Sequence, residues 1–204
     1  MTRRVAASGE TMAIAHGEAQ AVFLDRDGVI NEEINYLSRP DEFRLLPRSA
    51  AAIRRLRRRG YRVVVVTNQS GLARGYFSEA DLGTIHERMR RELARARTRV
   101  DGVYVCPHHP DDACACRKPG VSLFQQAAQD LGLDLGNSVF VGDKLTDLLP
   151  GKALGGGTVL VLTGYGQREF ALAQEQAFAP DHVAADLYAA ALWIIQPHED
   201  PPRL

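Results

Sequence analysis

Residues 21–28 have the sequence AVFLDRDG, in which a short apolar run ends in two aspartates and a glycine. An apolar run of this length, closed by a turn residue, predicts a buried strand that opens into a tight loop. Alternate residues of an extended segment point the same way, so Asp25 and Asp27 can face one small site. Carboxylates this close repel each other unless a cation lies between them or one carries a proton. The stretch predicts a divalent-metal site with a nucleophile and an acid/base group; the alternative is a solvated, Asp-rich turn.

The bulk composition limits the class of protein and its partners. The 204 residues can form one domain with its own core, without disulfides. The 25 Lys and Arg residues balance 25 Asp and Glu residues, so no global field favours nucleic acid or an anionic membrane. The arginine run at 54–59 alternates with apolar residues at helical spacing, which predicts a solvated helix face rather than a nucleic-acid patch.

No segment of the sequence has the pattern of a membrane or secretion signal. No apolar stretch is long enough to span a bilayer, and residues 1–20 lack the apolar core of a signal peptide. We therefore expect a cytoplasmic protein. It is expected to bind neither nucleic acid nor membrane and, as a separate expectation, to be a monomer. A disordered leader is expected at 1–20, one domain at 21–195 and a short tail at 196–204.

The rest of the chain alternates strand and helix patterns. After the first strand, further strands are expected at 62–66, 103–105, 138–141, 158–162 and 183–184. Helices are expected at 49–59, with Ser49 as the N-cap, and at 78–97, 122–131 and 186–195. This alternation predicts an α/β fold with a doubly wound parallel sheet and helices on both faces. Only a helix follows the second strand, so no large cap is expected.

Polar residues follow four of the predicted strands, at 25–27, 67–68, 106–118 and 142–144. Ligands of open parallel sheets bind beyond the carboxyl ends of the strands. Oxygen ligands that suit Mg²⁺ are offered there by Asp25, Asp27 and Asp143. Groups that suit a phosphate are offered by Thr67, Asn68, Arg117 and Lys118. Together these residues predict phosphoryl transfer to a carboxylate.

All three cysteines lie within residues 106–116. Clustering in a reducing compartment favours metal binding over a disulfide. Cys106, Cys114 and Cys116, with His108 or its neighbour His109, would complete a closed tetrahedral shell for structural Zn²⁺. The alternative is three incidental buried cysteines. The histidines outside this cluster, at 16, 86, 182 and 198, are expected to be incidental.

Several stretches together resemble a known enzyme family. Asp25-x-Asp27, Thr67, Lys118 and the GDxxxD pattern at 142–147 are similar to the four motifs of the haloacid dehalogenase superfamily of phosphohydrolases. Longer stretches resemble the D-glycero-D-manno-heptose 1,7-bisphosphate phosphatase family: FLDRDGVIN at 23–31, VTNQSGLARG at 66–75, CPHHP at 106–110, CACRKP at 114–119 and VGDK at 141–144. The resemblance extends over residues 21–195 and implies a haloacid dehalogenase-like sheet with a zinc-binding loop.

The resemblance also implies a role for each site residue. Asp25 would attack phosphorus and become an aspartyl phosphate, and Asp27 would act as acid and then as base. Thr67 and Lys118 would stabilise the transferring phosphoryl group. Mg²⁺ would be held by Asp25, Asp143 and the carbonyl of Asp27, and Zn²⁺ by Cys106, His108, Cys114 and Cys116. The substrate, a heptose bisphosphate that loses one phosphate, would contact Glu33, Ile34, Asn35, Tyr36, Asn68, Gln69, Ser70, Arg117 and Lys144. Asp147 would orient Lys144 or metal-bound water.

The zinc loop departs from the heptose pattern and leaves the substrate open. Cys106 and Cys114 are only eight positions apart, which is closer to the related histidinol-phosphate phosphatase domain. Residues 69–75 and the loop around Tyr36 follow the heptose family instead. The alternatives are therefore histidinol phosphate or another small phosphomonoester as substrate. A zinc-stabilised binding module with an inactive site is a further alternative, against which the complete set of motif residues argues.

Overall fold

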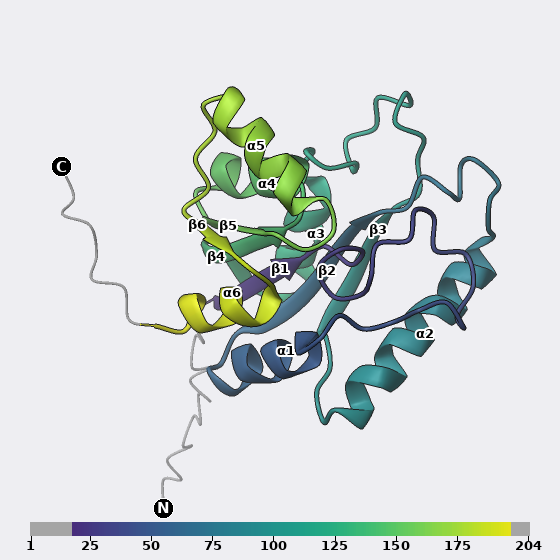
Figure 1. The fold of residues 1–204 in the computed structure, drawn as a ribbon, viewed down its shortest axis with the longest axis horizontal. Helices are drawn as coiled ribbons and strands as arrows, with labels where there is room; N and C mark the ends of the chain where they lie inside the picture. The colour runs from purple at the N-terminus through teal and green to yellow at the C-terminus, as the bar shows by residue number, and fades with distance from the viewer. Residues whose placement is uncertain (1–17, 197–204) are drawn as a thin grey trace, which may run out of the picture.

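The computed structural model describes residues 18–196, which form a six-stranded parallel sheet between helices (Figure 1). The strand order is β3-β2-β1-β4-β5-β6. The bounds are Ala19–Leu24 for β1, Arg62–Asn68 for β2, Gly102–Cys106 for β3, Leu133–Gly142 for β4, Gly157–Val161 for β5 and His182–Ala184 for β6. Every neighbouring pair is parallel, and the order reverses direction beside the central strand β1. The predicted doubly wound sheet is confirmed.

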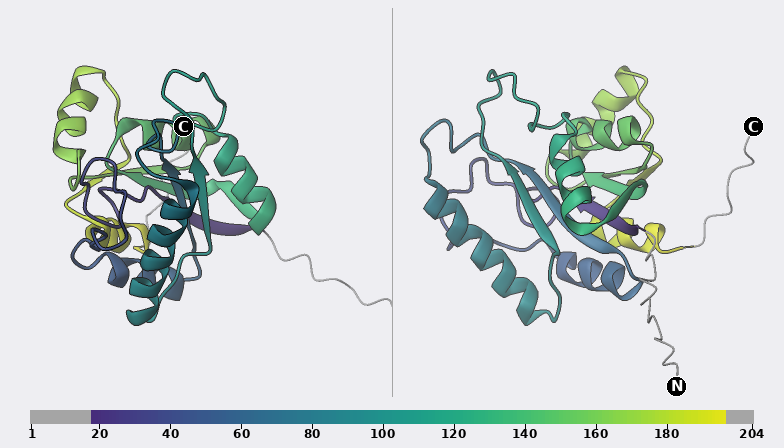
Figure 2. Two further views of the ribbon diagram at one scale, coloured as in Figure 1. Left: turned by 90° about the vertical axis from the view of Figure 1, so that its right-hand side faces the viewer. Right: turned by 180° about the vertical axis from the view of Figure 1, so that it is seen from behind.

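The sheet is buried on both sides (Figure 2). The helices are α1 (Ser49–Arg58), α2 (Glu79–Arg95), α3 (Ser122–Leu131), α4 (Leu145–Leu154), α5 (Gly166–Glu175) and α6 (Leu187–Ile194). Leu24 packs in a core with α1, α2 and α6, whereas its neighbour Phe23 packs with α3 on the opposite face. Because alternate residues enter different cores, the strands are continuously apolar.

Two helices, α4 and α5, were not predicted from the sequence. Pro150 and Gly151 lie in the middle of α4, and both are poor helix formers. Packing explains the glycine, because a side chain at Gly151 would overlap the ring of Phe140 on β4. Tertiary contact therefore overrides local propensity here, and no apolar helical period marks the segment in the sequence.

Several predicted boundaries were also wrong by a few residues. The N-cap of α1 is Arg48, with φ 62°, so Ser49 is the first residue of the helix. Strand β1 begins two residues before the predicted start, and β4 begins five residues early at Leu133, which pairs with Ala19. By contrast, the Ser78 cap of α2 is confirmed, because its hydroxyl accepts the Asp81 N–H within a capping box.

Within residues 18–196, the longest loop at the carboxyl edge of the sheet follows β1. Residues 25–48 follow β1, and their apolar members, such as Ile30 and Phe43, pack into the core with α1 and α2. Within residues 18–196, none of the loops at this edge carries a separate folded cap, and none of the helices could cross a membrane. Residues 1–17 of the predicted leader and residues 197–204 of the predicted tail lie outside the described part.

Candidate active site

A cavity of about 560 Å³ opens at the carboxyl edge of the central strands. Its lining includes most of the residues that the sequence predicted for a site there: Asp25, Asp27, Glu33, Asn35, Tyr36, Asn68, Gln69, Ser70, Arg117, Lys118 and Lys144. Thr67 and Asp143 are buried at the same strand ends, outside the lining itself. Ile34 is 41% exposed and is not among the described residues that line the cavity.

Three carboxylates, those of Asp25, Asp143 and Asp147, gather within 4.8 Å of one another. The ammonium of Lys118 lies between two of them, 2.9 Å from Asp25 Oδ1 and 2.8 Å from Asp147 Oδ1, and donates to the carbonyl of Val66 at 2.7 Å. Burial opposes the charge of Lys118, but the carboxylates of Asp147 and Asp25 outweigh it and raise the pKa of the ammonium. The lysine is therefore held charged beside the predicted nucleophile.

Of the three carboxylates, Asp143 has the fewest contacts that offset its negative charge, because Asp25 and Asp147 both pair with Lys118. Its Oδ2 accepts the backbone N–H of Tyr165 at 2.8 Å, whereas its Oδ1 has no hydrogen-bond partner among residues 18–196. Burial, with Asp147 and Asp25 nearby, raises the pKa of Asp143 to about 8. A divalent cation at Oδ1 would satisfy this atom and offset the crowded negative charge, so the donor set fits Mg²⁺.

Two glycines allow the backbone to come close to Asp143. Gly28 has φ +81° and Gly164 has φ +56°, and a Cβ atom at either would overlap Asp143 Oδ2. The Thr163 hydroxyl ties the two loops together by donating to the Gly28 carbonyl at 2.6 Å. The loop after β5 thus orients the carboxylate of Asp143, which directly follows β4, a role that the sequence did not indicate.

Asp27 has different surroundings from Asp25. Its carboxylate accepts hydrogen bonds from Arg26 at 3.1 and 2.7 Å, from Asn31 at 2.8 Å and from Gln69 at 2.9 Å. Burial raises the pKa of Asp27, but the charge and hydrogen bonds of Arg26 dominate and hold it below its usual range. These donors surround both carboxylate oxygens, and the expectation that the carbonyl of Asp27 ligates metal stays a prediction.

Asp147 makes two contacts that link neighbouring site residues. Its Oδ1 pairs with Lys118, and its Oδ2 accepts the backbone N–H of Lys144 at 3.1 Å. The expected link to Lys144 is therefore present through the main chain, and the link to Lys118 is an addition. A side chain at Gly142 would overlap Asp147, so the tight turn after β4 needs the glycine.

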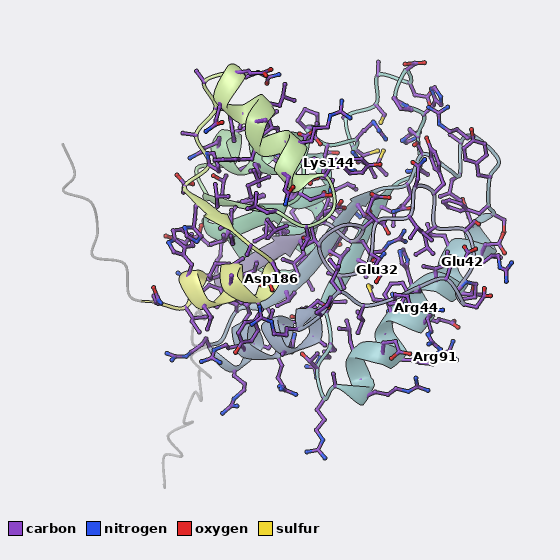
Figure 3. The ribbon with its side chains drawn as sticks, in the orientation of Figure 1. Glu32, Glu42, Arg44, Arg91, Lys144 and Asp186 are labelled. Carbon is purple, nitrogen blue, oxygen red and sulfur yellow. The ribbon has the colours of Figure 1, made fainter. Side chains whose placement is uncertain are left out.

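Lys144 connects the two sides of the cavity mouth, beside the start of α4 (Figure 3). Its ammonium lies 3.6 Å from Glu33 and 4.4 Å from the centre of the Tyr165 ring. Asn35 and Tyr36 both have left-handed backbones, with φ 55° and 59°. Such residues cluster at functional sites because the surrounding structure must enforce them.

The cysteine loop, which follows β3, is hydrogen-bonded to the end of β2. The Lys118 N–H donates to Asn68 Oδ1 at 3.1 Å, and Asn68 Nδ2 donates back to the Lys118 carbonyl at 3.2 Å. Arg117 lines the cavity, and its Nη1 is buried without a hydrogen-bond partner in the described part of the chain. This loop therefore delivers two cations, Arg117 and Lys118, to one cavity.

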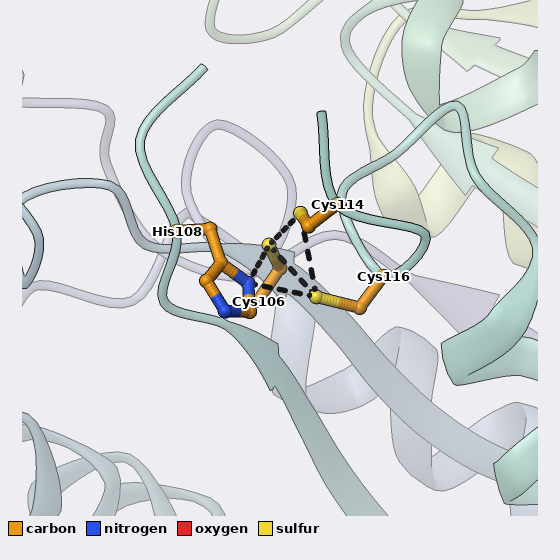
Figure 4. A group of neighbouring side chains, drawn as sticks. All are labelled: Cys106, His108, Cys114 and Cys116. Atoms are coloured by element: carbon orange, nitrogen blue, oxygen red, sulfur yellow. Dashed lines mark hydrogen bonds between the residues drawn. The ribbon is translucent and has the colours of Figure 1, made fainter. Parts of the chain in front are cut away.

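Cys106, His108, Cys114 and Cys116 converge at the base of that loop (Figure 4). The three sulfurs lie 3.2–3.6 Å apart, and His108 Nδ1 lies 3.1 Å from Cys116 Sγ and 3.7 Å from Cys106 Sγ. Zn–S bonds of about 2.3 Å in a tetrahedron would separate the sulfurs by about 3.8 Å. Burial raises the pKa of Cys106 to about 12, so a cation is needed to hold it as a thiolate. The set fits Zn²⁺.

The histidines outside this cluster differ from the expectation. His86 is buried on α2, with Nε2 3.1 Å from Arg26 Nη1, and His182 stacks on Trp193 at 4.7 Å. His16 and His198 lie outside the described residues. The position of His86, four residues after Leu82 and three before Met89, is the sequence signal for a core-facing residue.

Comparisons with known proteins agree with this geometry. A family model described as haloacid dehalogenase-like hydrolase matches residues 15–149, and a second, HAD-hydrolase-like model matches 115–190. The D-glycero-beta-D-manno-heptose-1,7-bisphosphate 7-phosphatase of Bordetella bronchiseptica is 43% identical over 176 residues, which cover 86% of this chain and 97% of the relative. The enzyme of the same name from Escherichia coli O6:H1 is 44% identical over 71% of this chain and 80% of its own length.

Solved structures give the same result. The crystal structure of D,D-heptose 1,7-bisphosphate phosphatase from B. bronchiseptica, complexed with magnesium and phosphate, matches with a TM-score of 0.80 and 41% identity. The match covers 86% of this chain and 98% of that one. A HAD-like phosphatase from Mesorhizobium loti matches with a TM-score of 0.73 and 33% identity, over 90% of this chain and 91% of that one. The chain therefore belongs to the D-glycero-D-manno-heptose 1,7-bisphosphate phosphatase family of haloacid dehalogenase-like hydrolases, as its motifs indicated, and it is a phosphatase.

Proposed function

We propose that this phosphatase is Mg²⁺-dependent and removes the 7-phosphate of D-glycero-D-manno-heptose 1,7-bisphosphate. The observation that carries the proposal is the placement of Lys118 against Asp25, beside the unpartnered Oδ1 of Asp143, at the base of a cavity of about 560 Å³. The names of the relatives, which share 37–45% identity with this chain, support the choice of substrate.

The first half of the proposed reaction uses Asp25 and Asp27. A carboxylate oxygen of Asp25 bonds to phosphorus while the bond from phosphorus to the sugar oxygen breaks. The negative charge of the bound phosphate favours the protonated form of Asp27, which then gives its proton to that oxygen, so the sugar leaves as an alcohol. The ammonium of Lys118, 2.9 Å from Asp25, offsets the negative charge that approaches the nucleophile.

The second half releases phosphate. Asp27, now a carboxylate, takes a proton from water as the water oxygen bonds to phosphorus. The bond between phosphorus and Asp25 breaks, which yields inorganic phosphate and restores the Asp25 carboxylate. Four hydrogen bonds from Arg26, Asn31 and Gln69 hold the basic form of Asp27 in place for this step.

Two metals complete the proposal. Mg²⁺ would be held by the carboxylates of Asp25 and Asp143 and the carbonyl of Asp27, and when bound it would shield charge on the phosphoryl oxygens. Zn²⁺ would be held by Cys106, His108, Cys114 and Cys116 as a structural ion. The closed, four-ligand set leaves no open position for catalysis. A cytoplasmic setting would keep Cys106, Cys114 and Cys116 reduced, and all three are free of disulfides in the described part of the chain.

The remaining phosphate and the sugar would contact the cavity wall. Arg117 and Lys144 supply positive charge there, and Glu33, Asn35, Tyr36, Asn68, Gln69 and Ser70 supply polar contacts. The free Nη1 of Arg117 can accommodate an oxygen of the phosphate that is retained. Ile34, at 41% exposure, would contact substrate only at the rim.

The test is a comparison of substrates at saturating Mg²⁺. We expect kcat/KM for heptose 1,7-bisphosphate to exceed that for histidinol phosphate and for sugar monophosphates, with phosphate released from C7 only. A matched control is Asp25→Asn, which keeps the shape of the side chain and removes the nucleophile. Preference for histidinol phosphate would contradict the proposed substrate and would favour the alternative that the short spacing of Cys106 and Cys114 indicates. Undiminished turnover by Asp25→Asn would refute the mechanism.

A further inference from the structure

Arg26 stands between the two catalytic aspartates and is the largest of the fully buried side chains in the described part of the chain. A guanidinium cannot lose its proton in a protein, so it is a permanent charge in the core. Burial of such a charge is costly unless the charge is paired and its hydrogen-bond donors are satisfied. The partners of Arg26 must therefore offset the free-energy cost of burying its charge.

The first partner of Arg26 is the next residue, Asp27. Nε donates to Oδ1 at 3.1 Å and Nη2 donates to Oδ2 at 2.7 Å, which fixes both carboxylate oxygens at once. A bidentate pair of this kind sets orientation as well as charge. The main chain reinforces the turn, because the Arg26 carbonyl accepts the N–H groups of Ile30 and Asn31.

The second partner is His86, which comes from α2, sixty positions along the chain. Its Nε2 lies 3.1 Å from Arg26 Nη1, and the ring is only 7% exposed. A guanidinium can only donate, so Nε2 accepts and the imidazole is the neutral tautomer with its proton on Nδ1. Burial, with the charges of Arg26 and Arg90, lowers the pKa of His86 to about 4, which agrees with a neutral ring.

Asp27 also connects this pair to the phosphoryl site. Gln69 Nε2 donates both to Asp27 Oδ2 and to Thr67 Oγ1, each at 2.9 Å. A continuous set of hydrogen bonds thus runs from α2 through His86, Arg26 and Asp27 to the end of β2. Arg26, Asp27 and Gln69 each contact a neighbour on both sides, whereas His86 joins the set through Nε2.

We propose that Arg26 and His86 are positioning residues for proton transfer: His86 orients the guanidinium, and the guanidinium aims the Asp27 carboxylate at the leaving oxygen. The inference rests on the proposed acid/base role of Asp27. A rival account is a purely structural ion pair, which would stabilise the fold without a specific effect on the proton-transfer step.

The experiment compares two classes of leaving group. A sugar alkoxide needs a proton to leave, whereas 4-nitrophenolate does not, so only the alkyl phosphate depends on an aligned Asp27. The parameter is kcat/KM, because it covers the steps through departure of the leaving group and excludes the later hydrolysis of the aspartyl phosphate. Protein stability is followed by thermal unfolding.

The test variants change only His86, the second partner of Arg26. His86→Leu removes the acceptor for Arg26, and His86→Gln restores one at the position of Nε2. Met89→Leu is the control, because Met89 is also fully buried on α2 and packs in the apolar core. If His86→Leu does not fold, His86→Asn replaces it, since its amide is too short to reach Arg26.

We expect His86→Leu to lower kcat/KM for the sugar phosphate about 10- to 100-fold, part of the roughly 10²–10⁴-fold contribution of a general acid. Turnover of 4-nitrophenyl phosphate should change less than about threefold, and His86→Gln should recover most of the loss. Equal losses for the two leaving groups, or no loss for either, would overturn the inference. Wild-type preference among alkyl phosphates tests the proposed function separately, and the comparison can use whichever alkyl phosphate the wild type prefers.

Discussion

Lys118 Nζ makes contacts of 2.7–2.9 Å with Val66, Asp25 and Asp147, so its three N–H donors have fixed partners. An ammonium on a flexible stem would otherwise lose about 2 kcal/mol of rotamer entropy on ordering. Here the order is already present before substrate binds, and the charge lies beside the nucleophile. At the scale of single residues, Lys118 is therefore ordered beside Asp25 by its protein contacts alone.

The two aspartates of the opening motif should fail in different ways when they are changed. Asp25→Asn removes the nucleophile and should abolish turnover. Asp27→Asn removes the proton donor and acceptor, a contribution of about 10²–10⁴-fold in kcat. Steady-state kinetics with a sugar phosphate measure both effects. Asp41→Asn is a suitable control, since Asp41 pairs with Arg39 on the exposed surface. Full activity in either aspartate variant would contradict the assignment.

Substitutions of Lys118 and Arg117 should change different kinetic parameters. Lys118→Ala removes charge that acts on the transferring phosphoryl group, and we expect kcat to fall about 10²–10³-fold. Arg117→Lys keeps the charge but loses the planar fork, so KM should rise about tenfold with little change in kcat. An unchanged kcat in Lys118→Ala together with an unchanged KM in Arg117→Lys would show that the loop is remote from the substrate.

The raised pKa of Asp143 predicts a pH-dependent response to Mg²⁺. Because the pKa of this buried carboxyl is about 8 in the folded chain and 3.8 for the unperturbed group, it favours folding when protonated. Its contribution to stability is therefore lost as pH rises from about 4 to about 8. Mg²⁺ must displace the proton, so its affinity should increase up to about tenfold per pH unit below the pKa.

Thermal unfolding with and without Mg²⁺ measures this response. The rise in Tm caused by Mg²⁺ should be larger at about pH 8 than at about pH 6. The control is Asp143→Asn, in which the amide cannot titrate and the pH-dependent part should disappear. An equal Mg²⁺ shift at both pH values in the wild type would contradict the proposed ligand.

At the scale of elements, the cysteine loop joins β3 to α3 and places two cations at the cavity. Cys116 directly precedes Arg117 and Lys118, and Asn68 fixes the Lys118 backbone from the end of β2. The loop is otherwise polar and contains prolines, so it has little apolar surface to order it. Metal ligation by the cysteines, together with the two hydrogen bonds between Asn68 and the Lys118 backbone, would fix the positions of the Arg117 and Lys118 side chains.

Loss of a zinc ligand should therefore affect stability first. We expect about one Zn²⁺ per chain in protein purified without added metal, and Cys116→Ser should lose it, with a lower Tm and a secondary loss of activity. Elemental analysis and thermal unfolding check these outcomes. The adjacent histidine supplies a control, since His109→Asn should retain zinc whereas His108→Asn should not. Zinc far below one equivalent in the wild type would contradict the site.

The elements also show where sequence patterns succeed. The strongly β-branched β2 and the capped helix α2 were predicted with the correct type and order. Helix α4 was missed because its fold depends on packing of Gly151 against Phe140, a contact that no local pattern contains. The strand ends were nevertheless located well enough to place the site, since Asp25 and Asp143 directly follow β1 and β4 and Thr67 lies in the last two residues of β2.

At the scale of the whole molecule, the sheet gathers residues that are far apart in the chain. Asp25, Lys118 and Asp143 follow three different segments, and the parallel arrangement brings their side chains to one edge. Spacing within each motif made these residues predictable. The tertiary neighbours of the motif residues were not, because His86, Thr163 and Tyr165 act through contacts across the fold and belong to no local motif.

The central claim of the account is that Asp25 carries the phosphoryl group. The most direct measurement is acid quenching of the enzyme during turnover of a sugar phosphate with Mg²⁺, followed by peptide mass spectrometry. The account predicts a phosphate adduct on Asp25 that hydroxylamine removes, as expected for an acyl phosphate, and that is absent from Asp25→Asn. Accumulation of the adduct should increase in Asp27→Asn if residual first-step activity remains, because the base for its hydrolysis is lost. An adduct on another residue, or full turnover by Asp25→Asn, would contradict the account.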